Sequence, residues 1–495
     1  MAKLYFSTSD DTSRSLIAKV KKGELIRIYR GIYTDASYAD VEKIVYSKWH
    51  EIVNYLFPSA IAAYRTAHEL RPVDGVIYIV KDGVSRRKIS IGGMLTIELS
   101  AGNTSELTEP FLPTIFRSSP ARQYLENLAL SRTKVKKSLG KEWVEQHLST
   151  VLRRQNGEDE LNNIRDQTRT FAIKYGFEHE FSTLENIISS LLSTHPYGGI
   201  LESEIAIATS QNTPFDVGRI DLFQSLADYL LRCNLEAVPY TYNKSSWKHL
   251  AFFESYFSNF IEGTEFEIDE AEEIVFTGST VHERHEDSHD VLAVFNQVSD
   301  LQSMSVTPST ADELIEALQQ SHFDFMRERK NKRPGKFKER VNKAGSSVFV
   351  HPSELVGTLT KAFDIYITLP KGLESAIFMQ FIISECHPFD DGNGRLSRIM
   401  MNRELHSVDL HKIIVPTVHR DSYLNGLRKA TRSGKFATIA KVFYQLQHYS
   451  ASIDWDSYGD SRETLEEHKA NLLPDEGVPT FNKVIRKFKF TPPPE

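Results

Sequence analysis

One short segment of the sequence holds most of the residue types that bind phosphate or move a proton. Residues 387–398 read HPFDDGNGRLSR. Gly392 and Gly394 lack a Cβ, so a ligand can approach the backbone N–H groups closely. If a helix begins at about Gly394, those N–H groups and the positive end of the helix dipole form an anion site. Phosphate is the anion that we expect there.

The other polar residues of this segment suit chemistry at a phosphate. Arg395 and Arg398 lie three positions apart, so both project from the first turn of the expected helix and can grip phosphate oxygens. Asp390 or Asp391 offers a carboxylate oxygen to Mg²⁺, which usually binds one or two carboxylates plus substrate phosphates. His387 stands before the loop, with an ordinary pKa near neutrality that suits a general base. The alternative is a polar loop in which Gly, Asn and Asp are common turn residues.

The segment matches the signature of the Fic family, H-x-F-x-[DE]-G-N-G-R-x-x-R, at every fixed position. The matching residues are His387, Phe389, Asp391, Gly392, Asn393, Gly394, Arg395 and Arg398. The resemblance implies a mainly α-helical Fic fold with a β-hairpin flap, and transfer of AMP from ATP to a protein hydroxyl. It also implies that His387 is the general base and that Asp391 holds Mg²⁺ or Mn²⁺. The nucleotide phosphates would be bound by Gly392, Asn393, Gly394, Arg395 and Arg398, and Phe389 would anchor the loop.

Other stretches resemble further parts of the same family site. RPGKF at 333–337 and SSVFVHP at 346–352 resemble the segment of the flap, which binds a target backbone as an added strand. The flap residues would be Ser347, Val348 and Phe349, and an ordinary surface hairpin is the alternative. Tyr423 resembles the aromatic residue on the adenine side, although a core tyrosine fits the same helical spacing.

SNFIEGT, upstream of the signature, matches the inhibitory pattern [ST]-x-x-x-E-[GN] of the family with Ser258, Glu262 and Gly263. A serine followed by a carboxylate is common on helices, so the pattern alone is weak, and its position before the signature strengthens it. The resemblance implies that Glu262 pairs with Arg398 and repels phosphate oxygens of like charge. The chain would then be inhibited by its own residues.

The N-terminal residues 13–35, SRSLIAKVKKGELIRIYRGIYTD, predict a short amphipathic helix that ends at Gly23 and a following hairpin. This run resembles the winged-helix domain of AbiEi-type antitoxins. Several positive side chains suit DNA phosphates: Lys19, Lys21, Lys22, Arg27 and Arg30. A solvated basic face on a module that contacts protein is the alternative.

The elements that must position these residues follow from hydrophobic patterns. Residues 373–386 are apolar nearly all round, as in a buried central helix, so helix, anion loop and helix form the expected core. Between about residues 55 and 192, strand-like runs give way to helices. We expect a winged-helix-like α/β domain at 1–75, a mixed α/β extension at 76–195, a Fic catalytic domain with its inhibitory helix at 196–460, and a mobile charged tail at 461–495. HPYGGI at 195–200 is the expected boundary loop.

Composition narrows the class of protein. The 495-residue chain has a net charge of −7 and 40% hydrophobic residues, which is typical of a soluble protein of two or three domains. No run is long enough to cross a membrane and the first residues lack a signal-peptide core, so we expect a cytoplasmic protein. Its two cysteines cannot build a disulfide framework. His282, His285 and His289 have spacings that zinc ligands use, but a solvated helix start fits them better.

The expected partners are ATP and an unidentified target protein, or the chain itself, with DNA as a partner of the N-terminal region and no membrane. Whether control acts within one chain or through a homodimer stays open. Rival functions are a transcriptional regulator whose Fic domain modifies its own chain, transfer from another nucleotide, and removal of AMP. The sequence does not specify the target, the modified residue type or the signal that displaces Glu262.

Overall fold

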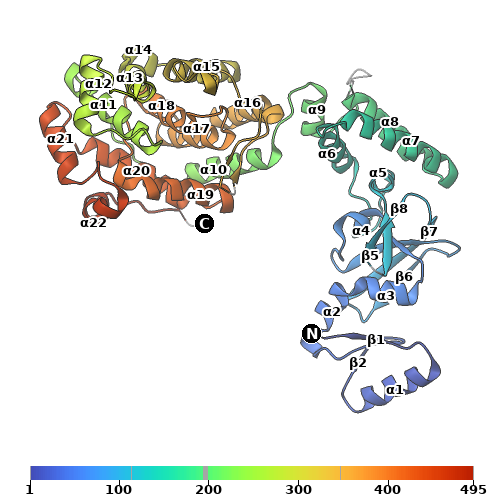
Figure 1. Ribbon diagram of the computed structural model, residues 1–495. Coiled ribbons are helices and arrows are strands. Elements are labelled where there is room, and N and C mark those ends of the chain that lie inside the picture. The colour runs from blue at the N-terminus through green and yellow to red at the C-terminus, as the bar shows by residue number, and fades with distance from the viewer. Residues whose placement is uncertain (1, 113, 193–198, 346, 494–495) are drawn as a thin grey trace. The chain divides into compact units, whose positions relative to one another are not determined.

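The computed structural model describes residues 2–112, 114–192, 199–345 and 347–493 (Figure 1). The chain divides into two compact units, Met1–Asn212 and Thr213–Glu495. Each unit has hydrophobic cores of its own. Within the described residues, every helix is too short or too polar to span a lipid bilayer.

The first unit begins with a three-stranded antiparallel sheet in the order β1-β3-β2. Its elements are β1 (Leu4–Phe6), α1 (Asp10–Lys21), β2 (Ile26–Tyr29) and β3 (Ile32–Thr34). The chain leaves α1 through Gly23, whose φ of 76° is left-handed and costs glycine little. The predicted helix and hairpin are confirmed, whereas β1 was not predicted because three residues carry too short a pattern.

A six-stranded mixed sheet, ordered β6-β7-β5-β4-β9-β8, follows. Its strands are β4 (Ile61–Ala62), β5 (Val76–Lys81), β6 (Arg87–Ile91), β7 (Leu95–Ala101), β8 (Thr108–Leu112) and β9 (Ile115–Ser118), with α2 (Val41–Ser47), α3 (Trp49–Leu56) and α4 (Tyr64–Glu69) interspersed. β4 pairs with β5, and one core joins Val53 to Leu99. The predicted domain boundary at residue 75 therefore falls inside a single sheet.

The rest of the first unit is helical: α5 (Pro120–Leu128), α6 (Lys141–Leu152), α7 (Gly157–Tyr175), α8 (Glu178–Leu191) and α9 (Glu204–Ser210). Ala206 of α9 is buried in one core with Leu148 and Leu184. The unit therefore extends past the predicted boundary at 195. Most of the predicted boundary loop, residues 195–198, lies outside the described residues.

The second unit is an assembly of helices with one small hairpin. Its elements are α10 (Val217–Arg232), α11 (Lys244–Ile261), α12 (Ile268–Thr277), α13 (His285–Ser299), α14 (Leu301–Met304), α15 (Ala311–Met326), β10 (Lys343–Ala344), β11 (Ser347–Val348), α16 (Leu355–Tyr366), α17 (Leu373–Cys386), α18 (Asn393–His406), α19 (Arg420–Ser433), α20 (Ala437–Ala451), α21 (Tyr458–Glu467) and α22 (Pro474–Ile485). α17 and α18 lie in the middle of this unit, as Figure 1 shows, and nearly all of their side chains are buried. The predicted fold class, a helical core with a hairpin and an N-terminal α/β region, is confirmed.

The C-terminal segment differs from the prediction of a mobile tail at 461–495. It contains α22 and most of α21, and it buries Leu465, Phe481 and Ile485 in the core of the second unit. Phe481 and Ile485 are four residues apart and share one face of α22. The many charges around these few apolar residues masked that pattern in the sequence.

Candidate active site

The signature residues form the connection between α17 and α18. α17 ends at Cys386, and α18 begins at Asn393, one residue before the predicted position. His387 and Gly392 both have a positive φ, 47° and 75°, which turns the chain sharply at each end of the loop. Phe389 is fully buried and anchors the loop, as predicted.

The side chain of Asn393 holds the loop closed. Its oxygen accepts a hydrogen bond from the N–H of Phe389 at 2.9 Å, and its amide nitrogen donates to the carbonyl of Phe389 at 2.8 Å. Both polar atoms of the side chain are thus used within the loop. The resemblance implied phosphate binding by Asn393, but the structure gives its side chain a bracing role.

His387 lies at the loop entrance, with its ring stacked on Phe349 at a centroid distance of 3.9 Å. Burial lowers the pKa of His387 to about 4, so its imidazole is neutral at pH 7. Nδ1 faces the carbonyl of Ser384 at 3.4 Å. A proton on Nδ1 leaves Nε2 with a lone pair, which is the form that a general base requires.

A cavity of about 350 Å³ connects some of the predicted site residues. Its lining includes Glu262, Ser347, Phe349, His387, Gly394, Arg398 and Tyr423. Tyr423 is only 1% exposed and its hydroxyl accepts a hydrogen bond from Gln380 at 2.9 Å. Tyr423 is therefore both a core residue and part of the cavity wall.

Glu262 lies where the sequence predicts an anion. It caps the C-terminus of α11, and Gly263 follows with a φ of 92°. Its Oε1 is 2.7 Å from Nη2 of Arg398; Nε of Arg398 donates to the hydroxyl of Ser258 at 3.0 Å, and Nη2 also donates to the carbonyl of Ser258 at 2.9 Å. A Cβ on Gly394 would stand only 2.1 Å from that same Oε1. The carboxylate thus rests on the first turn of α18.

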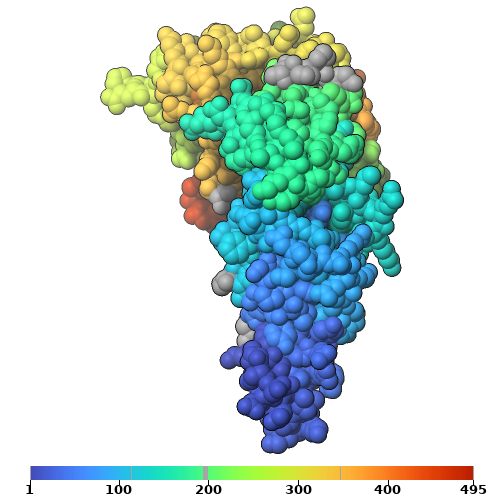
Figure 2. Space-filling view, turned by 90° about the vertical axis from the view of Figure 1, so that its right-hand side faces the viewer, coloured from blue at the N-terminus to red at the C-terminus, as the bar shows by residue number. Residues whose placement is uncertain are grey.

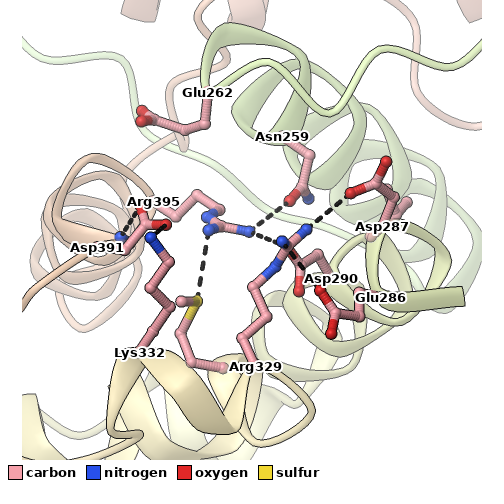
Figure 3. A network of polar contacts seen from close by, with 12 residues as sticks. Asn259, Glu262, Glu286, Asp287, Asp290, Arg329, Lys332, Asp391 and Arg395 are labelled. Carbon is pink, nitrogen blue, oxygen red and sulfur yellow. Dashed lines mark hydrogen bonds and ion pairs between the residues drawn. The ribbon is translucent and has the colours of Figure 1, made fainter. Parts of the chain in front are cut away.

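Arg395 belongs to a different set of contacts (Figure 3). It is 3% exposed and donates to Asp290 at 2.7 Å and to Asn259 at 3.3 Å. Arg329 donates to the same oxygen of Asp290 at 2.8 Å. Arg395 is not among the residues that line the cavity of Arg398, and phosphate binding by Arg395 stays a prediction.

Asp391 offers one carboxylate oxygen to a cation. Its Oδ1 accepts the N–H of Gly392 at 2.7 Å, and its Oδ2 lies 3.5 Å from the ammonium of Lys332. Burial alone would raise the pKa of Asp391, but the Gly392 hydrogen bond, Arg395 and Lys332 outweigh it and lower the pKa. An ionised oxygen that already faces a cation fits a hard metal such as Mg²⁺.

These observations can be set beside known proteins. The model of the Fic/DOC family matches residues 308–405. This part of the chain is a Fic/DOC domain. Proteins of this family usually transfer nucleoside monophosphates to proteins. A search of the curated proteins found no match.

Solved structures of Fic proteins resemble the chain at low identity. A Fic domain containing signaling protein from Bacteroides thetaiotaomicron is 18% identical, with 48% of this chain and 96% of that chain covered and a TM-score of 0.37. A fragment of Fic-1 from C. elegans is 15% identical, with 65% and 92% covered and a TM-score of 0.37. A Fic family protein from Desulfovibrio desulfuricans is 14% identical, with 51% and 75% covered and a TM-score of 0.33.

The hairpin of β10 and β11 lies beside the cavity of the Fic/DOC domain. Its Val348 is 50% exposed, and the carbonyl of Val348 accepts a hydrogen bond from Arg219 at 2.7 Å. Residues 333–337, expected to belong to this flap, do not. Instead Arg333 pairs with Asp390 at 2.9 Å and Phe337 packs on Phe389, so this segment supports the loop.

Two residues of the Fic/DOC domain that support the loop carry no motif in the sequence. His322 of α15 stacks on Phe389 at 3.8 Å, and its two ring nitrogens bridge the N–H of Gly335 and the carbonyl of Asp391 at 2.9 and 3.1 Å. Lys338 donates to the carbonyl of Cys386 at 2.8 Å. Each acts across tens of residues of sequence, so only the fold reveals it.

The predicted DNA-binding residues lie in the first unit, outside the Fic/DOC domain. All five are exposed, at the end of α1, in β2 and in the turns beside them: Lys19, Lys21, Lys22, Arg27 and Arg30. The segment that carries them, dark blue in Figure 2, lies open at the surface in that view.

Proposed function

We propose that the chain is an autoinhibited protein adenylyltransferase, which moves AMP from ATP to a tyrosine, threonine or serine hydroxyl of a target protein or of itself. One observation supports this most strongly. The neutral imidazole of His387 and the first turn of α18 line a single cavity. In that cavity the carboxylate of Glu262 lies against Gly394 of the same turn.

In the proposed reaction, Nε2 of His387 accepts the hydroxyl proton as the hydroxyl oxygen attacks the α-phosphorus. A new P–O bond forms to the target, the bond between the α-phosphorus and its bridging oxygen breaks, and pyrophosphate leaves. The N–H group of Gly394 and the guanidinium of Arg398 would face the developing negative charge, while the N–H of Gly392 holds the carboxylate of Asp391 at 2.7 Å. Asn393 holds the loop in shape, and Tyr423 lines the adenine side.

Mg²⁺ or Mn²⁺ would be held by Asp391 and would neutralise phosphate charge. The nearby Lys332 ammonium, 3.5 Å from Oδ2, supports this assignment because it marks a position where a cation is stable. The flap residues Ser347, Val348 and Phe349 would bind the target backbone as an added strand beside His387.

Inhibition follows from competition for one position. Glu262 satisfies Arg398 at 2.7 Å and lies against Gly394, so a phosphate can reach neither group until the carboxylate moves. Like charges would also repel one another there. Ser258 contributes by holding Arg398 in the orientation that Glu262 binds.

A second candidate function is DNA binding by the first unit, in a cytoplasmic regulator whose Fic/DOC domain modifies its own chain or a homodimer partner. The observation that favours it is the exposed group of five basic side chains on α1 and the following hairpin. Binding of a DNA fragment that weakens steeply with salt, and that Arg27→Ala with Arg30→Ala reduces, would support it.

The decisive experiment incubates wild type, Glu262→Gly, and Glu262→Gly with His387→Ala with α-labelled ATP and Mg²⁺, followed by intact-mass analysis. We expect one or more AMP additions in Glu262→Gly, little in wild type, and none in the double variant. The double variant should still bind ATP. AMP transfer by the double variant would contradict the role of His387, and equal transfer by wild type and Glu262→Gly would contradict inhibition.

A further inference from the structure

We propose that the Fic/DOC domain has a second binding site, a cleft around Arg403 that takes a ligand with a single carboxylate and an apolar body. The cleft has a volume of about 830 Å³ and lies between α15, the segment 334–336 and the C-terminal half of α18. None of its lining residues lines the cavity of His387.

Arg403 provides the buried positive charge in this cleft, whose lining also includes the exposed Lys336. It is 8% exposed, and its contacts are Ser303 Oγ at 3.2 Å from Nη2 and Met400 Sδ at 3.7 Å from Nη1. Its Nε is buried and has no hydrogen-bond partner among the described residues. No carboxylate of the described residues lies within ion-pair distance of the guanidinium of Arg403. A buried cation left in this state is costly, so an anion that reached it would be bound firmly.

The charges around Arg403 favour a ligand with a single carboxylate over a polyanion. Burial lowers the pKa of Arg403, while Asp324 and Asp300 raise it from a distance. Of the acids in the lining, Glu313 is engaged by the N–H and hydroxyl of Ser309 at 2.8 and 2.7 Å, and Glu316 is exposed. Glu313 and Glu316 would repel a polyanion such as a nucleoside triphosphate more strongly than a ligand with a single carboxylate, which could pair with the buried Arg403.

The remaining walls favour an apolar body on that ligand. The lining includes Pro308, Ala317 and Pro334, together with Phe323 and Val306, which are 49% and 64% exposed. A hydrophobic group that covered Phe323 and Val306 would remove this surface from water. The cleft thus offers one cationic end and an apolar wall, which is the complement of an aryl or alkyl carboxylate.

The test uses 4-phenylbutyrate as the probe and 4-phenylbutan-1-ol as its uncharged match, with calorimetric titration into the full chain. We expect saturable binding of the carboxylate and at least tenfold weaker binding of the alcohol. Arg403→Met should weaken carboxylate binding at least tenfold, and Phe323→Ser should weaken both probes. Arg428→Met, in the other cavity, is the matched control and should bind as wild type does.

Equal affinity for the two probes, an unchanged Arg403→Met, or no saturable binding by wild type at millimolar probe would overturn the proposal. If Arg403→Met does not fold, as judged by its thermal unfolding, Gln320→Trp at the exposed rim decides in its place. That variant should fill the cleft and abolish binding, and unaltered binding there would equally overturn the proposal. These outcomes are independent of AMP transfer.

Discussion

Arg395 and Arg398 stand one turn apart on α18, yet their surroundings differ. Arg395 is bound to Asp290, which is fully buried, and Arg329 shares that carboxylate. Arg398, by contrast, is bound to Glu262, whose side chain is 29% exposed and which follows the last turn of α11. The buried pair can only be broken at a large energetic cost, whereas the pair with Glu262 can be exchanged for a ligand. The first is a structural contact and the second a contact suited to control.

The substitution with the largest expected effect removes the buried ion pair of Arg395 with Asp290. Asp290→Asn removes the carboxylate that two arginines share and leaves the buried Arg395 without an acidic partner among the described residues, so we expect a loss of about 3–5 kcal/mol in unfolding free energy. Asp287→Asn is the matched control, because Asp287 also pairs with Arg329 at 2.7 Å but is 31% exposed. It should lose less than about 1 kcal/mol. Thermal unfolding of the full chain measures both, and equal losses would contradict the distinction.

The next largest effect is expected for Arg398 and is a change in the rate of AMP transfer. In the Glu262→Gly background, Arg398→Ala should lower AMP transfer by about 100-fold, since it removes a charged donor from the phosphate site. Labelled ATP measures the rate, and ATP titration separates binding from turnover. A variant that transferred AMP as fast as its Glu262→Gly parent would show that Arg398 serves Glu262 alone.

A smaller effect depends on pH and involves His322, which supports the loop from α15. Burial lowers the pKa of His322 to about 4, below its ordinary value of about 6.5 in the unfolded chain. The unfolded state therefore binds more protons between these values, and stability falls as pH falls from 7 to 5. The contribution is roughly 1–2 kcal/mol.

Comparing wild type with His322→Gln at pH 7 and pH 5 isolates this contribution, because other buried histidines act equally in both. We expect the stability of wild type to fall more steeply than that of His322→Gln over this range. His351→Gln, which changes an exposed histidine, should behave as wild type does. Parallel slopes for wild type and His322→Gln would show that His322 takes up its proton as readily in the folded as in the unfolded chain.

The smallest effect tests the cation beside Asp391. Lys332 and Asp391 are 39% and 41% exposed and 3.5 Å apart, so Lys332→Ala should change stability by less than about 1 kcal/mol. It should, however, lower the Mg²⁺ concentration that Glu262→Gly needs for half-maximal transfer, since ammonium and metal compete for one oxygen. An increase in that concentration would mean that Lys332 helps to bind the nucleotide instead.

The features that could be predicted from the sequence are those that depend on residues close together along the chain. The central helix, the loop glycines, the start of α18 and the helix and hairpin near the N-terminus follow from local spacing, and residue patterns shared with the family implied the contact of Glu262 with Arg398. The fate of Arg395 depends on Asp290, which lies 105 residues away, and no periodicity encodes such a pair. The support from His322 and the folded C-terminal helices were missed for the same reason.

In the proposed function, the position of Glu262 on Gly394 would also set the apparent affinity for nucleotide. A ligand that requires a minor state binds more weakly by the fraction of molecules in that state. If the carboxylate were displaced in about one molecule in 100, ATP would bind about 100-fold more weakly than the open site allows. A partner that drew Glu262 away would then raise occupancy by ATP at constant ATP concentration, without touching the nucleotide.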